Sequence, residues 1–120
     1  MKFLIYGIRN LSATQETKAR VILTQELKNL NSSDTILLSK TRGISTLAKF
    51  LAGDNEIPVV VKDNKDFLSS GPRGASLLRD RELVSESDAV FVFWDKICDS
   101  TRQVIKYAKH LKKPLRIIYL

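Results

Sequence analysis

Cysteine and histidine are almost missing from this chain of 120 residues, which contains one of each. The single cysteine, Cys98, excludes a disulfide within the chain and agrees with a reducing compartment. The single histidine, His110, argues against a Ser-His-Asp triad and against a zinc site rich in histidine. The two residues fall at opposite ends of one expected helix, so His110 is badly placed to activate Cys98 as a nucleophile.

Long apolar runs are also lacking. The longest are of strand length, far short of the roughly 20 residues that a membrane-spanning helix needs. The first ten residues, MKFLIYGIRN, contain an apolar segment too short for a signal peptide, and it runs directly into a glycine turn. We therefore expect a cytoplasmic protein with no membrane partner.

Acidic residues are fewer than basic ones, since 13 Asp and Glu oppose 20 Lys and Arg, which gives a net charge of +7. Such an excess can indicate an anionic partner such as a nucleotide, a nucleic acid or a membrane surface. The basic residues are scattered, however. Their densest cluster, over residues 106–113, lies at the end of an expected helix, where cations complement the helix dipole. This scattered distribution makes nucleic acid a less favoured partner than a small nucleotide.

Apolar spacing predicts strands over residues 2–6, 35–38, 58–61, 89–93 and 115–119. Four helices are expected between them: after Ser12 or Thr14 as N-cap, over residues 44–52, over residues 73–85 following the polar loop 62–71 and Pro72, and from the end of the loop 94–99 to before Pro114. This alternation predicts one domain, residues 1–120, with an α/β Rossmann-like three-layer sandwich. Its five-stranded, mainly parallel sheet carries helices on both faces.

Ligands of such sheets bind beyond the carboxyl ends of the strands, where the strand order reverses. In the usual order the reversal lies between the first and fourth strands. We therefore expect the binding site among the loops at residues 7–12, 39–43 and 94–101.

Several segments in and around these loops resemble a known family. They are Gly7-Ile8-Arg9, residues 38–45 (LSKTRGIS), Gly71-Pro72 with Arg79-Asp80, and SDAVFVFWD followed by Ser100-Thr101. Together they are similar to small proteins of the SLOG superfamily, in the YspA-like (DUF2493) branch of short Rossmann-like domains. The similarity covers nearly the whole chain in order. It implies binding of a nucleotide or nucleotide-derived ligand, with a signalling role. Some relatives, the lonely-guy-type phosphoribohydrolases, cleave nucleoside monophosphates.

The chain departs from the family pattern in its glycine loops. The Gly-Ser-Arg turn is Gly7-Ile8-Arg9 here, the Ser-Gly-Gly loop is Ser39-Lys40-Thr41, and Gly-Ala-Asp is Gly43-Ile44-Ser45. The glycine-rich phosphoribohydrolase motif is absent from the sequence. Glycine lets backbone N–H groups approach a phosphate closely. We therefore expect either an altered site or a phosphate held by side-chain charge.

The candidate ligand-binding residues follow strand ends. Guanidinium and hydroxyl groups suit a phosphate, an indole can stack on a base, and glycines permit tight turns. The candidates are Arg9, Arg42, Ser100 and Thr101 for phosphate, Trp94 for the base, and Gly7 and Gly43 for the turns. The alternatives are that the arginines are ordinary exposed loop residues, that Asp99 or Ser100 only caps a helix, and that Trp94 only covers the sheet end.

Two aspartates are weaker candidates for chemistry. Asp95 and Asp99 could hold Mg²⁺ beside a phosphate or act as an acid/base pair, or they could simply stabilise the turn and the helix start. Arg79 and Asp80 match the family's Arg-Asn pair imperfectly and could instead be a surface pair on a helix.

The sequence thus favours a domain that binds or senses a nucleotide without catalysis. One alternative is an N-glycosidic hydrolase acting on nucleoside monophosphates. Another is an interaction module with a degenerate site that contacts nucleic acid or a protein partner. Strand edges and the loosely patterned third helix offer surfaces for homo-oligomers.

Overall fold

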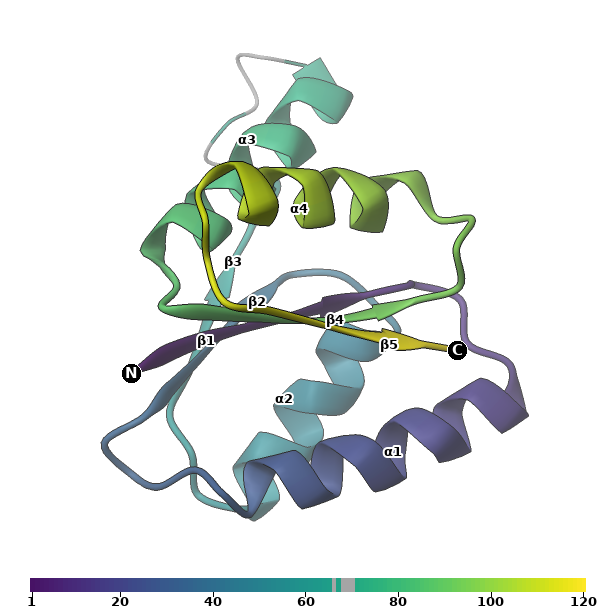
Figure 1. The fold of residues 1–120 in the computed structure, drawn as a ribbon, viewed down its shortest axis with the longest axis vertical. Coiled ribbons are helices and arrows are strands. Elements are labelled where there is room, and N and C mark those ends of the chain that lie inside the picture. The colour runs from purple at the N-terminus through teal and green to yellow at the C-terminus, as the bar shows by residue number, and fades with distance from the viewer. Residues whose placement is uncertain (66, 68–70) are drawn as a thin grey trace.

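The computed structural model describes residues 1–65, 67 and 71–120, in which five strands alternate with four helices (Figure 1). The strands are β1 (Lys2–Gly7), β2 (Thr35–Ser39), β3 (Val59–Lys62), β4 (Ala89–Trp94) and β5 (Leu115–Tyr119). The helices are α1 (Ala13–Leu27), α2 (Ile44–Asp54), α3 (Gly71–Glu86) and α4 (Asp99–His110). The loop expected over residues 62–71 lies partly outside the described residues.

Every neighbouring pair in the sheet is parallel, and the strand order is β3-β2-β1-β4-β5. The order therefore reverses between β1 and β4, where Gly7 pairs with Phe93 at the carboxyl ends. Helices α1 and α2 cover one face of the sheet, and α3 and α4 cover the other (Figure 1). This arrangement confirms the predicted Rossmann-like three-layer sandwich.

The central strands supply an apolar core to each face, because successive side chains of a strand point to opposite sides. Ile5 and Phe93 belong to the core shared with α1 and α2. Leu4, Tyr6 and Val92 belong to the core shared with α3 and α4. Tyr6 therefore points toward the layer that contains α3.

Helix α1 begins with a capping box. The Ser12 hydroxyl accepts a hydrogen bond from the Gln15 backbone N–H at 3.1 Å, and the Gln15 side chain accepts one from the Ser12 backbone N–H at 3.0 Å. Ser12 rather than Thr14 is thus the N-cap. The spacing of the leucines predicts that the helix reaches Leu30, but it ends at Leu27. Leu30 still packs against the core.

Helix α3 begins at Gly71, two residues earlier than predicted. Its buried face also differs from the one that apolar spacing predicts. The apolar spacing of Ala75, Leu78 and Leu83 predicts that Leu78 faces the core, but Leu78 is 39% exposed, whereas Arg79 and Asp80 are buried. The reason is the helical period: Ala75, Arg79 and Leu83 are four residues apart and share one buried stripe. The interpretation of Arg79 and Asp80 as a surface pair is therefore wrong.

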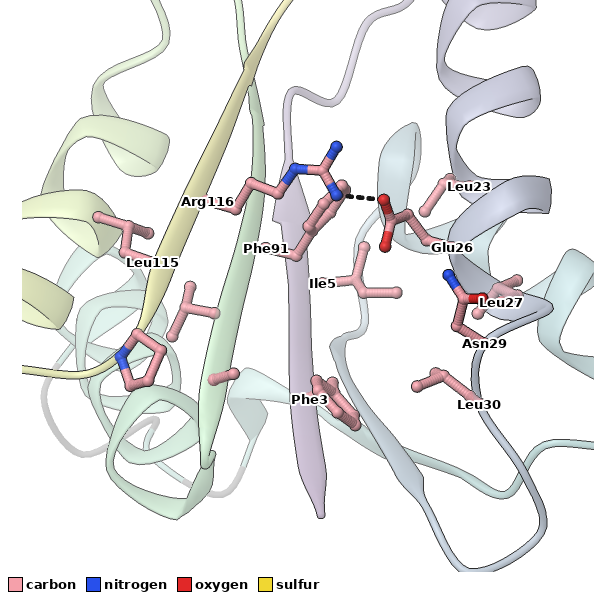
Figure 2. Close-up of a pocket in the computed structure, with 13 residues that line it drawn as sticks. Phe3, Ile5, Leu23, Glu26, Leu27, Asn29, Leu30, Phe91, Leu115 and Arg116 are labelled. Carbon is pink, nitrogen blue, oxygen red and sulfur yellow. Dashed lines mark hydrogen bonds and ion pairs between the residues drawn. The ribbon is translucent and has the colours of Figure 1, made fainter.

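An apolar groove of about 430 Å³ lies between α1 and strands β1, β4 and β5 (Figure 2). Arg116 of β5 forms an ion pair with Glu26 of α1 across it, and the Arg116 guanidinium lies 5.0 Å from the centre of the Phe91 ring. Phe3 and Ala89, which also line the groove, belong to the amino-terminal halves of their strands. The groove is thus remote from the edge where ligands of such sheets bind.

Among the described residues, no helix is both long and apolar enough to cross a bilayer.

Candidate functional site

A hollow of about 690 Å³ opens between α3 and the start of α4, beside the carboxyl end of β1. We call it the α3–α4 hollow. Its lining residues come from the loop after β1, from the first half of α3 and from the first turns of α4: Arg9, Arg73, Ser76, Leu77, Asp80, Asp99, Ser100 and Gln103. The hollow lies at the strand-order reversal, where the fold predicts a ligand.

A buried network supports the inner side of this hollow. The Tyr6 hydroxyl donates a hydrogen bond to Oδ2 of Asp80 at 2.7 Å, and Nε of Arg79 donates one to Oδ1 of Asp80 at 3.0 Å. Nη2 of Arg79 is buried and lies 3.0 Å from the same Asp80 oxygen as an ion pair, but it forms no hydrogen bond among the described residues. A buried carboxylate requires such donors, because losing its hydration is costly. Both carboxylate oxygens of Asp80 are therefore already engaged.

Burial shifts the pKa values of both acidic groups in the network. It raises the pKa of Asp80 above its usual range, although the charge of Arg79 and the hydrogen bond from Tyr6 partly offset this. Burial also raises the pKa of Tyr6, and the charge of Asp80 adds to the effect. Tyr6 thus remains a protonated donor at neutral pH.

Cationic groups at the rim are available for a ligand. Arg9 and Arg73 are exposed, and among the described residues neither forms an ion pair. Asp99 supplies the other carboxylate of the lining, and its Oδ1 lies 3.5 Å from Nη1 of Arg102. The first backbone N–H groups of a helix lack intrahelical partners and attract anions, so the start of α4 adds to this positive character. The arrangement suits a phosphate.

Two of the predicted phosphate ligands meet in this hollow and two do not. Arg9 and Ser100 both line it. Thr101 is fully buried, and its hydroxyl donates to Sγ of Cys98 at 3.4 Å. Arg42 lines a separate hollow between α1 and α2, beside Arg20. The structure thus separates Arg42 from Arg9, although both follow strands at the same edge.

Trp94 is engaged within its own loop. Its indole Nε1 donates a hydrogen bond to the Cys98 carbonyl at 3.0 Å, and the Arg102 guanidinium lies 5.8 Å from the ring centre. Trp94 does not line the α3–α4 hollow, in which Leu77 is the apolar residue. The apolar surface of this hollow therefore comes from α3 and not from Trp94.

The predicted turn glycines hold the loops close together. Gly43 has a φ of 78°, and a Cβ there would lie 2.5 Å from the Arg9 carbonyl oxygen. At Gly7, a Cβ would lie 2.8 Å from the Phe93 carbonyl oxygen. Only glycine fits such approaches without displacing the backbone. These two residues therefore position Arg9 beside β4.

The loop that lacks the family glycines is closed by its own hydroxyl groups. Ser39 lies 2.9 Å from Thr41 and 3.2 Å from Ser45, measured between side-chain oxygens, and Thr41 donates to Ser45 at 3.2 Å. Ser39 and Ser45 are buried. This loop therefore satisfies its side chains internally rather than presenting a cradle of backbone N–H groups.

The candidate catalytic aspartates have structural partners. Oδ1 of Asp95 accepts hydrogen bonds from the backbone N–H groups of Ile97 and Cys98, both at 2.8 Å. Partial burial opposes ionisation of Asp95, but these hydrogen bonds outweigh it and lower the pKa of Asp95 below its usual range. Asp99 begins α4 and is largely exposed. In the described part of the chain, no three Asp, Glu, His or Cys side chains converge as metal ligands.

Comparison with known proteins bears on the fold. No protein-family model matches the chain, and no curated protein matches its sequence. Among solved structures, it is similar to DNA processing protein A from Helicobacter pylori, which binds single-stranded DNA, with a TM-score of 0.72 and 16% identity. The likeness shows the fold. It covers 98% of this chain and 64% of the other, so the chain spans less than two thirds of that neighbour.

The sequence did not indicate Tyr6 or Arg73 as site residues, and it offered Arg79 and Asp80 only as an imperfect match to a family pair. A usable signal was present for Arg79, because Ala75 and Leu83 are each four residues away and place it on an apolar stripe. Tyr6 gave no such signal, since an aromatic residue in an apolar strand is normally part of the core. Its hydroxyl becomes informative only when Asp80 is seen opposite.

Proposed function

We propose that the chain is a SLOG-type domain that binds a nucleotide or nucleotide-derived ligand in the α3–α4 hollow without catalysing its breakdown. The observation that carries this proposal is the convergence of Arg9, Arg73 and Ser100 with the start of α4 at the strand-order reversal. These groups supply charge, a hydroxyl and a helix N-terminus at one place, which is the combination that phosphate binding uses.

In this proposal the phosphate lies between the two guanidiniums and the first turn of α4. Leu77, which is 37% exposed, offers apolar surface to a base or ribose, and Gln103 offers an amide. The carboxylates support a binding role, because Asp80 accepts from Tyr6 and Arg79, and Asp95 accepts from its own loop. Both oxygens of Asp80 and one oxygen of Asp95 thus have structural partners, which favours binding over general-base catalysis by these two residues.

A thermal-shift assay with a panel of nucleotides tests this proposal. A ligand at 100 times its Kd stabilises a folded protein by about 2.7 kcal/mol, so binding should raise the Tm clearly. The double variant Arg9→Gln and Arg73→Gln should lose this increase. Arg42→Gln is the matched control, because it removes one guanidinium from a separate hollow and should keep the increase. If no nucleotide raises the Tm of the unmodified chain, the proposal is wrong.

Single-stranded nucleic acid is the second candidate ligand class. Two observations favour it: the net charge of +7, and the fold shared with a protein that binds single-stranded DNA. Phosphate contacts release counterions, so affinity of this kind falls steeply with salt. Filter binding of a labelled oligonucleotide at about 50 mM and about 200 mM salt tests this candidate. If the filter retains no oligonucleotide at the lower salt concentration, single-stranded nucleic acid is excluded as a ligand.

A further inference from the structure

A second hollow, of about 460 Å³, lies between α1 and α2. These two helices cover the opposite face of the sheet from α3 and α4 (Figure 1). We call it the α1–α2 hollow. Its lining combines an exposed aromatic ring with charged groups from both helices and from the turn before α2: Leu11, Glu16, Arg20, Arg42, Gly43, Thr46, Leu47 and Phe50. None of the roles argued above for the α3–α4 hollow uses this surface.

Phe50 is the unusual residue of this hollow. It is 62% exposed, whereas Leu47 and Leu51 on the same helix are buried. The core face of α2 is thus complete without Phe50, which projects from the helix beside the hollow. A large exposed aromatic side chain has no role in the core, and it becomes useful where a planar partner can stack on it.

The charges around Phe50 favour an anion. Arg42 is exposed, and among the described residues it forms no ion pair. Arg20 lies 3.2 Å from Glu16, an exposed pair one helical turn apart, which is weak in water. Two guanidiniums therefore oppose one carboxylate at the lining. Gly43 fixes the turn that carries Arg42, because its φ is 78° and a Cβ there would lie 2.5 Å from the Arg9 carbonyl oxygen, which leaves no room for a side chain.

We propose that the α1–α2 hollow binds single-stranded nucleic acid, with a base stacked on Phe50 and the neighbouring phosphates held by Arg42 and Arg20. Stacking on aromatic rings and charge along the backbone are the two elements by which proteins hold single strands. Arginine suits this role because its planar fork matches a phosphate. The proposal rests on the second candidate function given above and assigns it to a surface separate from the α3–α4 hollow.

Fluorescence anisotropy with a labelled single strand of about 15 nucleotides tests the assignment. Phe50→Ala should weaken binding about tenfold or more, the effect typical of a lost stacking contact, and Phe50→Tyr should restore it. Arg42→Gln should weaken binding and reduce the slope of log affinity against log salt by about one. Val21→Ala is the control, since Val21 is an exposed apolar residue of α1 outside this hollow and should leave affinity unchanged.

The possible failures are distinguishable. If the unmodified chain binds no single strand at about 50 mM salt, both this assignment and the nucleic-acid candidate are wrong. If binding survives Phe50→Ala and Arg42→Gln but is lost in the Arg9→Gln and Arg73→Gln double variant, only the assignment is wrong. Equal affinity for a duplex of the same sequence would also overturn it, because paired bases cannot stack on Phe50. DNA and RNA strands of one sequence identify which nucleic acid is preferred.

Discussion

At the scale of single residues, the most informative contact is the one between Tyr6 and Asp80. A carboxylate that is 6% exposed must be compensated, and Asp80 receives one hydrogen bond from β1 and one from its neighbour Arg79. The network connects α3 to β1, the strand that precedes the loop with Arg9. It therefore fixes the distance between the two sides of the α3–α4 hollow, in addition to neutralising a buried charge.

Asp95 gives a prediction that depends on pH. Asp95→Ala removes the acceptor of two backbone N–H groups and should destabilise the fold by about 1–3 kcal/mol at neutral pH. The folded-state pKa of Asp95 is lowered, so the stabilisation is present above the unfolded pKa of about 3.9 and is lost as pH falls through the folded pKa. Urea unfolding at a series of pH values should show the difference between the two proteins narrowing in acid.

The control for this prediction is Asp99→Ala. Asp99 is 74% exposed at its side chain and forms a surface pair with Arg102, which is worth little in water. Its replacement should change stability by less than about 0.5 kcal/mol at neutral pH. An effect of Asp95→Ala as small as that of Asp99→Ala would show that the hydrogen bonds of Asp95 do not hold the loop.

At the scale of elements, the two glycines of the α2 segment should respond in opposite ways. Gly43→Ala places a side chain at positive φ and against the Ile8 and Arg9 carbonyl groups, so it should cost more than about 2 kcal/mol. Gly53→Ala lies within the helix with open space around it and should stabilise by about 0.5–1 kcal/mol. Chemical denaturation of both variants checks the pair. Similar effects at the two positions would contradict the role assigned to Gly43.

The helices and strands could largely be predicted, because the spacing of apolar residues indicates which face of each one is buried. Strand β5 has the predicted bounds, and α2 begins at Ile44 as expected. Helix α3 was less predictable, because a buried arginine breaks the apolar pattern that marks a core face. Burial of Arg79 is tolerable only with Asp80 and Tyr6 beside it, and a partner from β1 is not visible in the local sequence.

The candidate site could be predicted only as an edge of the sheet. Arg9 and Ser100, which were predicted from their positions after strands, line one hollow. Position after a strand could not separate Arg42 from them, because the face to which a loop turns depends on the helix that follows, and α2 packs on the other side of the sheet. Thr101 was equally undetermined, since the side chains of adjacent residues at a helix start point in different directions.

At the scale of the whole molecule, the two hollows divide the positive charge between opposite faces of the sheet. Helices α1 and α2 cover one face and α3 and α4 cover the other (Figure 1). Arg9 and Arg73 belong to one hollow, and Arg20 and Arg42 to the other. A net charge of +7 raises the local concentration of any anion around the molecule, but it does not choose between the two surfaces. The choice depends on the groups beside the arginines: Ser100 and a helix start in one hollow, and an exposed Phe50 in the other.

The apolar groove between α1 and strands β1, β4 and β5 gives a prediction about how α1 packs on the sheet (Figure 2). Open apolar surface of this size binds hydrophobic dyes, so the folded chain should enhance the fluorescence of anilinonaphthalene sulfonate. Ala89→Glu places a charge in the groove and should abolish the enhancement, while Ile97→Glu, at an exposed apolar residue outside it, should not. Near-ultraviolet circular dichroism must remain native in both variants, because a loosened core binds the same dye. Equal fluorescence from the two variants would show that the dye does not bind in this groove, the result expected if the Arg116–Glu26 ion pair holds α1 against β5 in solution.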